Sequence, residues 1–405
     1  MEQICPYEEC TGCAACRNIC PTATISMVEE GPCGFIHPSI NQDLCINCNL
    51  CRKVCPVINP VKLSPPFNAF AAVSKSSPDY RESASGGAAS SLALSVLNKG
   101  GVIYGCESVN WLIIQHSRFS SSQSVPAMRG SKYVQSSIGE IFKQVKKDLN
   151  SQLQVMFTGT PCQIAGLKRF LMKDYENLIT VDLVCHGVSS HKLLRDNVKE
   201  MLQHYGLHPD NSTKIWFREK SDKPNPHIDY GVFINNSAIK RSCQLLPRNN
   251  YIAAFMASLS FRDNCYKCPY ACGNRCSDIT VGDFWGLGKD CKIPIENGVS
   301  LIMVNSPKGK QFLEENRKLF FIEERSIEEA INGNSHLKSP SSMPAARAYF
   351  LDNYAKMPQK AYEISLSQYR KQFYQRQTKL KIKKILKSIP GVKLLLVGRR
   401  KLIQK

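Results

Sequence analysis

The chain contains no apolar run long enough to cross a bilayer, which takes about 20 consecutive apolar residues. An integral membrane protein built on helices is therefore not expected. Residues 1–30 have neither a basic start nor an apolar core of the kind found in secretory signals. We therefore expect a cytoplasmic protein, in a compartment that keeps thiols reduced.

Acidic residues are missing from the C-terminal stretch. From Arg370 to Lys405 there are thirteen Lys or Arg and no Asp or Glu, so this stretch supplies +13 of the net charge of +20. The rest of the chain carries only +7, and aromatics are sparse in the tail. Nucleic-acid binding is therefore not expected. A helix with basic and apolar faces favours an anionic membrane surface, so we expect peripheral contact at the inner face of the cell membrane. A partner-docking helix or a solvated terminus is the alternative.

Cysteine, by contrast, is abundant, with nineteen residues that cluster at regular spacings. Two runs near the N-terminus have the form Cys-x2-Cys-x2-Cys-x3-Cys-Pro. The cysteines of the two runs are Cys10, Cys13, Cys16, Cys20, Cys45, Cys48, Cys51 and Cys55. This duplicated run is typical of bacterial ferredoxins, in which the fourth cysteine of each run binds the other [4Fe–4S] cube. Zinc also uses Cys-x2-Cys pairs, with four ligands per ion. A duplicated run of four cysteines with proline after each fourth cysteine is rarely a zinc site.

The ferredoxin spacing predicts two clusters with exchanged fourth ligands. Cys10, Cys13, Cys16 and Cys55 form the first ligand set, and Cys45, Cys48, Cys51 and Cys20 form the second. Residues 1–60 are thus predicted to be a 2[4Fe–4S] ferredoxin module. Its function is one-electron exchange with a redox partner, because nothing in this segment indicates a substrate site.

After a proline-containing linker, residues 67–339 alternate between strand and helix patterns. This alternation predicts a mixed α/β domain with antiparallel additions, so that the whole chain combines α+β and α/β architecture. Residues 340–405 are predicted to be a helical basic tail. The expected strands are 67–73, 102–109, 111–119, 153–157, 178–184, 214–218, 230–234, 279–283 and 301–304, and the expected helices are 88–98, 137–150, 162–172 and 190–205.

A third group of cysteines indicates another metal centre. Cys162 and Cys185 each follow a predicted strand, where open α/β sheets place their ligands. Cys162 also begins a helix, a position that lowers a thiol pKa. Two ligand sets compete for a third cube. The local set is Cys265, Cys268, Cys272 and Cys276, and the distributed set is Cys162, Cys185, Cys265 and Cys268. Zinc at the local set, with Cys162 and Cys185 as ordinary buried thiols, is also consistent with the residues.

Small residues precede the helix that starts at Ala88. In Ser85-Gly86-Gly87 the backbone N–H groups can face an anion at a helix N-terminus, and a flavin pyrophosphate would suit this site. The loop Arg129–Tyr133 adds basic residues. Gly86, Gly87 and Lys132 are the predicted flavin contacts. A plain tight turn and a solvated basic loop are the alternatives.

Together these segments resemble the beta subunit of coenzyme F-420 hydrogenase/dehydrogenase, in the ferredoxin-fused form seen in bacteria. The resemblance covers roughly residues 1–300. The motifs that carry it are Ser85–Gly87, Arg129–Tyr133, Gly159–Gln163, Cys185–Gly187, Cys265-x2-Cys268 and Ser277–Gly286.

The resemblance implies a flavin-binding domain with FAD beside a [4Fe–4S] cluster, and an oxidoreductase of unknown substrate. It favours the distributed ligand set, although Cys272 and Cys276 exceed the two cysteines that the family pattern requires at that segment. It also implies an association with surface-polysaccharide biosynthesis. The alternative function is a non-catalytic electron-transfer or adaptor subunit of a larger complex.

Overall fold

The computed structural model describes residues 3–220 and 228–388. Residues 1–344 form one compact unit and residues 345–405 form another. The part of the basic tail beyond residue 388, which includes Val392–Val397 and Arg399–Lys401, lies outside the described residues. None of the described helices combines the length and apolar character needed to cross a membrane.

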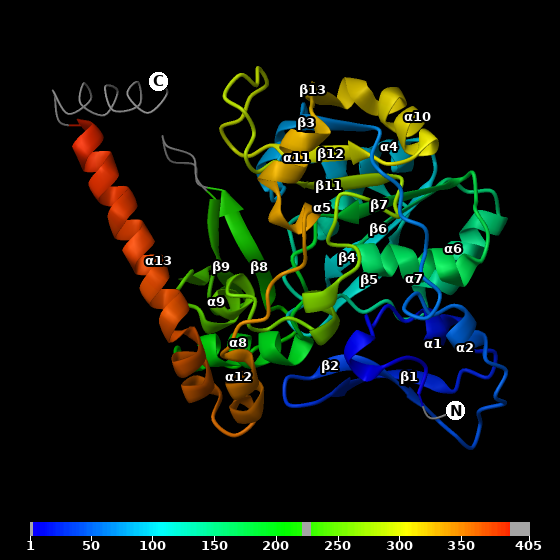
Figure 1. The fold of residues 1–405 in the computed structure, drawn as a ribbon, viewed down its shortest axis with the longest axis horizontal. Coiled ribbons are helices and arrows are strands. Elements are labelled where there is room, and N and C mark those ends of the chain that lie inside the picture. The colour runs from blue at the N-terminus through cyan, green and yellow to red at the C-terminus, as the bar shows by residue number, and fades with distance from the viewer. Residues whose placement is uncertain (1–2, 221–227, 389–405) are drawn as a thin grey trace, which may run out of the picture. The chain divides into compact units, whose positions relative to one another are not determined.

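An eight-stranded mixed sheet forms the centre of the first unit (Figure 1). Its strand order is β13-β3-β12-β11-β7-β6-β4-β5, in which neighbours among β4, β6, β7 and β11 pair in parallel and all other neighbouring strands pair antiparallel. The strands are β3 (Asn68–Ser74), β4 (Val102–Ser108), β5 (Ile114–Phe119), β6 (Val155–Gly159), β7 (Leu178–Leu183), β11 (Ile279–Asp283), β12 (Ser300–Val304) and β13 (Phe320–Arg325). The mixed α/β class predicted for residues 67–339 is confirmed.

Helices cover both faces of this sheet, which explains why its central strands are almost continuously apolar. On one face α6 and α7 pack on β4, β6 and β7, and on the other α4 and α10 pack on β3, β4 and β12. The helices of this unit are α3 (Ser77–Glu82), α4 (Ala88–Asn98), α5 (Val125–Met128), α6 (Ile141–Asn150), α7 (Pro161–Leu171), α8 (His191–Gln203), α9 (Asn250–Met256), α10 (Pro307–Asn316) and α11 (Ile327–Gly333).

A separate three-stranded antiparallel sheet lies between α8 and α9 in the sequence, with strand order β10-β9-β8. Its strands are β8 (Lys214–Lys220), β9 (Ile228–Asn235) and β10 (Ser242–Leu245). The predicted strands 214–218 and 230–234 fall within β8 and β9. This sheet brings two basic residues of β8 to the edge of the main domain, as described below.

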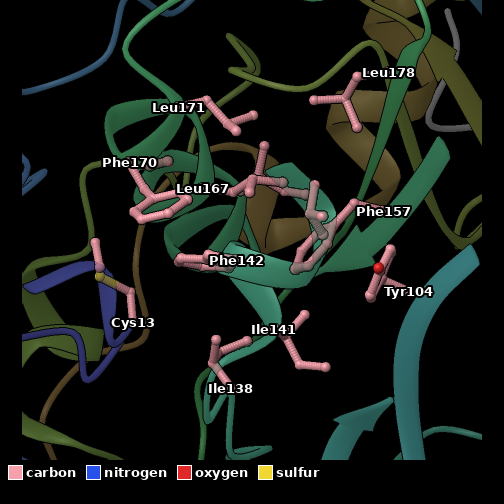
Figure 2. Packing of buried hydrophobic residues seen from close by; sticks show 14 of the residues in the cluster. Cys13, Tyr104, Ile138, Ile141, Phe142, Phe157, Leu167, Phe170, Leu171 and Leu178 are labelled. Atoms are coloured by element: carbon pink, nitrogen blue, oxygen red, sulfur yellow. The ribbon is translucent and has the colours of Figure 1, made fainter. Parts of the chain in front are cut away.

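The ferredoxin module contains two short helices and one hairpin, and it packs on the α6–α7 layer. Its elements are α1 (Ala15–Ile19), β1 (Ile25–Glu30), β2 (Phe35–Ile40) and α2 (Leu50–Lys53). Cys13 reaches the edge of the apolar cluster around Phe142 and Phe170 (Figure 2). Arg195 of α8 also pairs with Glu29 of β1, with N–O distances of 2.6 and 2.8 Å. The module is therefore part of the same compact unit as the main domain.

The second unit contains α12 (Arg347–Tyr354) and the long α13 (Pro358–Ser388). The rings of Phe350, Tyr354 and Tyr362 pack together with centroids 5.0–5.6 Å apart, which joins the two helices. The distal part of α13 exposes several apolar side chains among its basic residues, namely Tyr374, Leu380, Ile382, Ile385 and Leu386. The predicted helical character of the tail is confirmed as far as residue 388.

Candidate functional site

The first ferredoxin run folds around a pocket that its own cysteines line. Cys10, Cys13 and Cys16 lie on this pocket together with Cys55 from the second run. The structure therefore brings together the four residues of the first predicted ligand set. A fifth thiol, Cys5, lies on the same pocket and hydrogen bonds with Cys10 and Cys55. Cys5 stands outside the repeat, so the spacing gave no indication of it.

The two cysteine runs repeat their backbone conformation as well as their spacing. Gly12 and Ala14 have positive φ angles of 64° and 60°, and Asn47 and Asn49, thirty-five residues later, have 52° and 61°. A left-handed conformation costs a non-glycine residue roughly 1–2 kcal/mol. These turns direct successive thiols toward one centre, which is how a short loop can wrap a cube.

The second predicted ligand set lies nearer the surface. Cys51 interacts electrostatically with Cys48 and Cys20, and Cys48 is exposed. Burial acts to raise the pKa of Cys20, but hydrogen bonds with the hydroxyls of Thr24 and Thr22 lower it to about 7. Cys45 contacts the side chain of Asn47. Two large apolar residues beside it, Leu44 and Ile46, are about 60% exposed.

A second pocket gathers cysteines from three distant segments. Cys162, Cys185, Cys265 and Cys268 all line it, and these are the four residues of the distributed set. Cys162 is in the first turn of α7, which begins at Pro161 after a capping box of Thr160 and Gln163. Cys185 follows β7, so the carboxyl ends of the neighbouring parallel strands β6 and β7 are each followed by one cysteine of this pocket.

Cys272 and Cys276, the other members of the local set, do not line this pocket. The Cys272 thiol lies 3.3 Å from the carbonyl oxygen of Asn274, and the Cys276 thiol points into the apolar core, 3.6 Å from the carbonyl oxygen of Pro161. The guanidinium of Arg275 holds this loop through its bond to Asp182 at 2.8 Å and to the carbonyl of Tyr270 at 2.8 Å. Cys272 and Cys276 therefore stand outside the lining of the pocket, although Cys276 packs in the same cluster as Cys162 and Cys268.

The chemistry of the second pocket fits a thiolate-bound group. Burial raises the pKa of Cys265 to about 12 and of Cys268 to about 11, and it also raises the pKa of Cys162 despite its position at a helix N-terminus. As free thiols these groups are protonated at neutral pH, so a bound cation must displace their protons. Two buried polar atoms on the same pocket, Asn264 Oδ1 and His336 Nδ1, have no hydrogen-bond partner among the described residues.

Among the described residues, no three His, Cys, Asp or Glu side chains are arranged as ligands of a single metal ion.

The predicted flavin contacts have structural partners of their own. A Cβ on Gly86 would lie 2.3 Å from the carbonyl oxygen of Ala72 and 2.5 Å from the amide nitrogen of Ser300, so Gly86 allows the loop to pack on β3 and β12. Gly87 has a φ of 83° and is the N-cap of α4. The Lys132 ammonium donates to the carbonyls of Met128 and Arg129, both at 2.8 Å, at the end of α5.

Two cations of β8 approach the Ser85–Gly87 loop, and the sequence motifs did not indicate them. Arg218 bonds to Asp283 at 2.8 Å, to the hydroxyl of Tyr133, and to the carbonyl of Ala84. Lys220 donates to the carbonyl of Ser85 at 2.6 Å, and desolvation lowers its pKa to about 8. Only the tertiary fold brings β8 to this loop, from more than 130 residues away.

Residues 153–330 match the family model that describes the C terminus of the beta subunit of coenzyme F420 hydrogenase/dehydrogenase, and residues 9–59 match the 4Fe-4S dicluster domain. A comparison with curated proteins gave no match. One similar solved structure comes from the F420-reducing [NiFe] hydrogenase complex of Methanosarcina barkeri, examined by xenon derivatization. It is 16% identical, with a TM-score of 0.44, and the alignment covers 78% of this chain and 94% of that one.

Proposed function

We propose that this chain, whose residues 153–330 match the C-terminal model of the coenzyme F420 hydrogenase/dehydrogenase beta subunit, is an iron–sulfur flavoprotein oxidoreductase. Its ferredoxin module exchanges single electrons with an external carrier, and its main domain acts on a two-electron substrate. The observation that carries this proposal is the second pocket, where four cysteines from distant segments converge beside the ferredoxin module.

The distributed set of Cys162, Cys185, Cys265 and Cys268 holds the third [4Fe–4S] cluster in this proposal. The position of Cys272 and Cys276 away from the pocket argues against the local set and against zinc there. Thr11 lines both the first and the second pocket, so the two sites share a wall. Clusters of this kind supply one-electron transfer when bound, with potentials set by charge, hydrogen bonds and exposure.

We place FAD at the Ser85–Gly87 loop. A flavin accepts electrons singly and delivers them in pairs, which suits a junction between clusters and a two-electron substrate. The predicted contacts of the flavin remain Gly86, Gly87 and Lys132. Positive charge for its pyrophosphate comes from Arg218 and Lys220, which donate to the carbonyls of Ala84 and Ser85. Arg218 lies over the rings of Tyr133 and Tyr230, at 5.4 and 4.9 Å from their centroids. These stacked contacts fix its guanidinium beside the loop.

A second candidate function is an electron-transfer subunit without turnover of its own. The observation that favours it is that packing and helix capping already account for Gly86 and Lys132. This reading predicts three clusters and no flavin in the purified protein. A role in surface-polysaccharide biosynthesis rests on the family resemblance alone, and it guides the choice of acceptors for screening.

Paired variants test the third cluster directly. We expect Cys185→Ser, purified anaerobically, to contain about four fewer irons per chain than the native protein, because one four-iron cube is lost. The matched variant Cys272→Ser removes a cysteine of the Cys265–Cys276 group that does not line the pocket, and it should keep the full iron content. Loss of iron in Cys272→Ser but not in Cys185→Ser would refute the distributed site.

A further inference from the structure

Arg262 is a buried arginine that lies between the ferredoxin module and the second pocket. It directly precedes the short helical turn η3 (Asp263–Lys267), which contains Cys265, and its side chain is only 2% exposed. It is the largest of the fully buried side chains among the described residues. Arginine stays protonated in proteins, so a full positive charge lies in the interior at this point.

The side chain of Arg262 binds the ferredoxin module. Its Nε donates to the carbonyl of Cys10 at 2.6 Å, and one Nη donates to the carbonyl of Ile36 at 2.7 Å. The other Nη lies 3.0 Å from Nε2 of His37. Cys10 is a ligand of the first cluster in the proposed function, so the guanidinium touches the backbone of that ligand.

The backbone of Arg262 binds the second pocket. Its carbonyl accepts from the amide of Cys265 at 3.0 Å, and its own amide donates to the carbonyl of Val188 at 3.0 Å. Cys265 and Val188 both line that pocket. One residue therefore joins Cys10 to Cys265 through two hydrogen bonds.

Among the described residues the guanidinium forms no direct ion pair with a carboxylate, and the nearby Asp263 and Glu30 act with Arg262 on the Tyr7 hydroxyl. The groups that bind the guanidinium are carbonyls, an imidazole nitrogen, and the side-chain oxygen of Gln135 at 3.3 Å. A buried ion without a counter-charge is costly. The thiolates that a bound cluster requires are the groups that can supply negative charge, because the guanidinium binds the backbone of Cys10 and the Arg262 carbonyl binds the amide of Cys265.

We propose that Arg262 is a positioning residue shared by the two sites, whose buried charge raises the reduction potentials of both bound clusters together. The inference rests on the proposed function, because it requires a cluster at each pocket. A cube held by four thiolates is net negative, and reduction adds one electron without making or breaking a bond. A fixed positive charge therefore favours the reduced form at both sites.

The test is a redox titration of each cluster in the full-length, anaerobically purified protein, followed by EPR. The Cys185→Ser variant assigns the signal of the third cluster. In Arg262→Gln we expect the equilibrium constant for one-electron reduction to fall about tenfold at the first and third clusters, which corresponds to about 59 mV. The more exposed cluster of Cys45, Cys48, Cys51 and Cys20 should keep its potential.

Two further variants separate charge from structure. Arg262→Lys keeps the charge and should stay near the native potentials. Arg195→Gln also removes an arginine that joins α8 to the ferredoxin module, but from a partly exposed pair with Glu29, and it should shift neither potential. Unchanged potentials in Arg262→Gln, equal shifts at all three clusters, or equal shifts in Arg262→Lys and Arg262→Gln would each overturn the inference.

If Arg262→Gln does not fold, Gln135→Glu serves instead, because it places a carboxylate against the guanidinium. It should lower the same two potentials, and unchanged values would overturn the inference. A native protein without any signal from the third cluster would refute the proposed function itself, whatever the Arg262 variants do.

Discussion

Gly166 of α7 and Cys13 of the ferredoxin module approach so closely that a Cβ on the glycine would lie 2.8 Å from the Cys13 sulfur and 2.9 Å from its Cβ. Glycine is unfavourable inside a helix by about 1 kcal/mol relative to alanine. Gly166 therefore has a packing role, because it allows the ferredoxin module to approach the helix that begins beside Cys162. The contact couples the first cluster site to the main domain.

We predict that Gly166→Ala displaces Cys13 and lowers the iron content by up to one cube, about four irons per chain. Helix propensity alone would stabilise the helix and leave the iron content unchanged, so a loss of iron would indicate the close contact with Cys13. Iron and sulfide analysis after anaerobic purification measures it. The control Lys147→Ala alters an exposed position on α6 and should retain full iron. Full iron content in Gly166→Ala would contradict the packing role.

A second prediction concerns pH and Lys220. Desolvation lowers its pKa to about 8, from an unfolded value near 10.4. The folded protein therefore loses this positive charge as the pH rises through about 8, while below that pH the ammonium is charged. If Lys220 binds an anion at the Ser85–Gly87 loop, affinity should be greatest below pH 8 and should fall above it.

Equilibrium dialysis of FAD against the flavin-depleted protein between pH 6.5 and 9.5 measures this dependence. Lys220→Gln should bind FAD more weakly and should lose the fall in affinity near pH 8. Arg241→Gln is a suitable control, because that arginine belongs to an exposed pair with Glu219. An identical pH profile in the native protein and Lys220→Gln would show that Lys220 does not contact the ligand.

Most strands of the main domain were predictable because their residues show simple apolar patterns, whereas helices α3, α5, α9, α10 and α11 were missed. The helix predicted at 88–98 coincides with α4, and the strand 279–283 coincides with β11. The β1–β2 hairpin was missed, since Gly31 to Gly34 separate two short strands of mixed character. Strand β13 was missed as well, because its alternation of Phe320, Ile322 and charged residues is brief. The match of residues 9–59 to a dicluster domain confirms the ferredoxin module.

Spacing alone predicted the site only where candidate ligands are local in sequence, and the distributed set that lines the second pocket came from the family resemblance. The spacing of Cys10, Cys13 and Cys16 predicts a cluster by itself, and the structure brings the three cysteines to one pocket. Arg218 and Arg262 carry no such signal, because their roles arise from contacts with residues more than 60 positions away. The convergence of Cys162 and Cys185 required the parallel pairing of β6 with β7, which a single sequence does not specify.

The basic tail gives a prediction that is independent of the redox site. Helix α13 exposes apolar side chains between lysines, and basic residues contribute about 1 kcal/mol each near an anionic surface. We expect the full chain to float with liposomes that contain anionic lipid, and a chain truncated at Arg370 to remain in the soluble fraction. Neutral liposomes are the control. Equal flotation of the two proteins would refute membrane contact through the tail.

The most direct test of the central claim is a combined analysis of iron, sulfide, zinc and released flavin on one anaerobically purified sample. Three cubes of four irons predict about twelve irons per chain, together with one FAD and no zinc. About eight irons with stoichiometric zinc and no flavin would contradict the account, and would leave a ferredoxin joined to a binding domain.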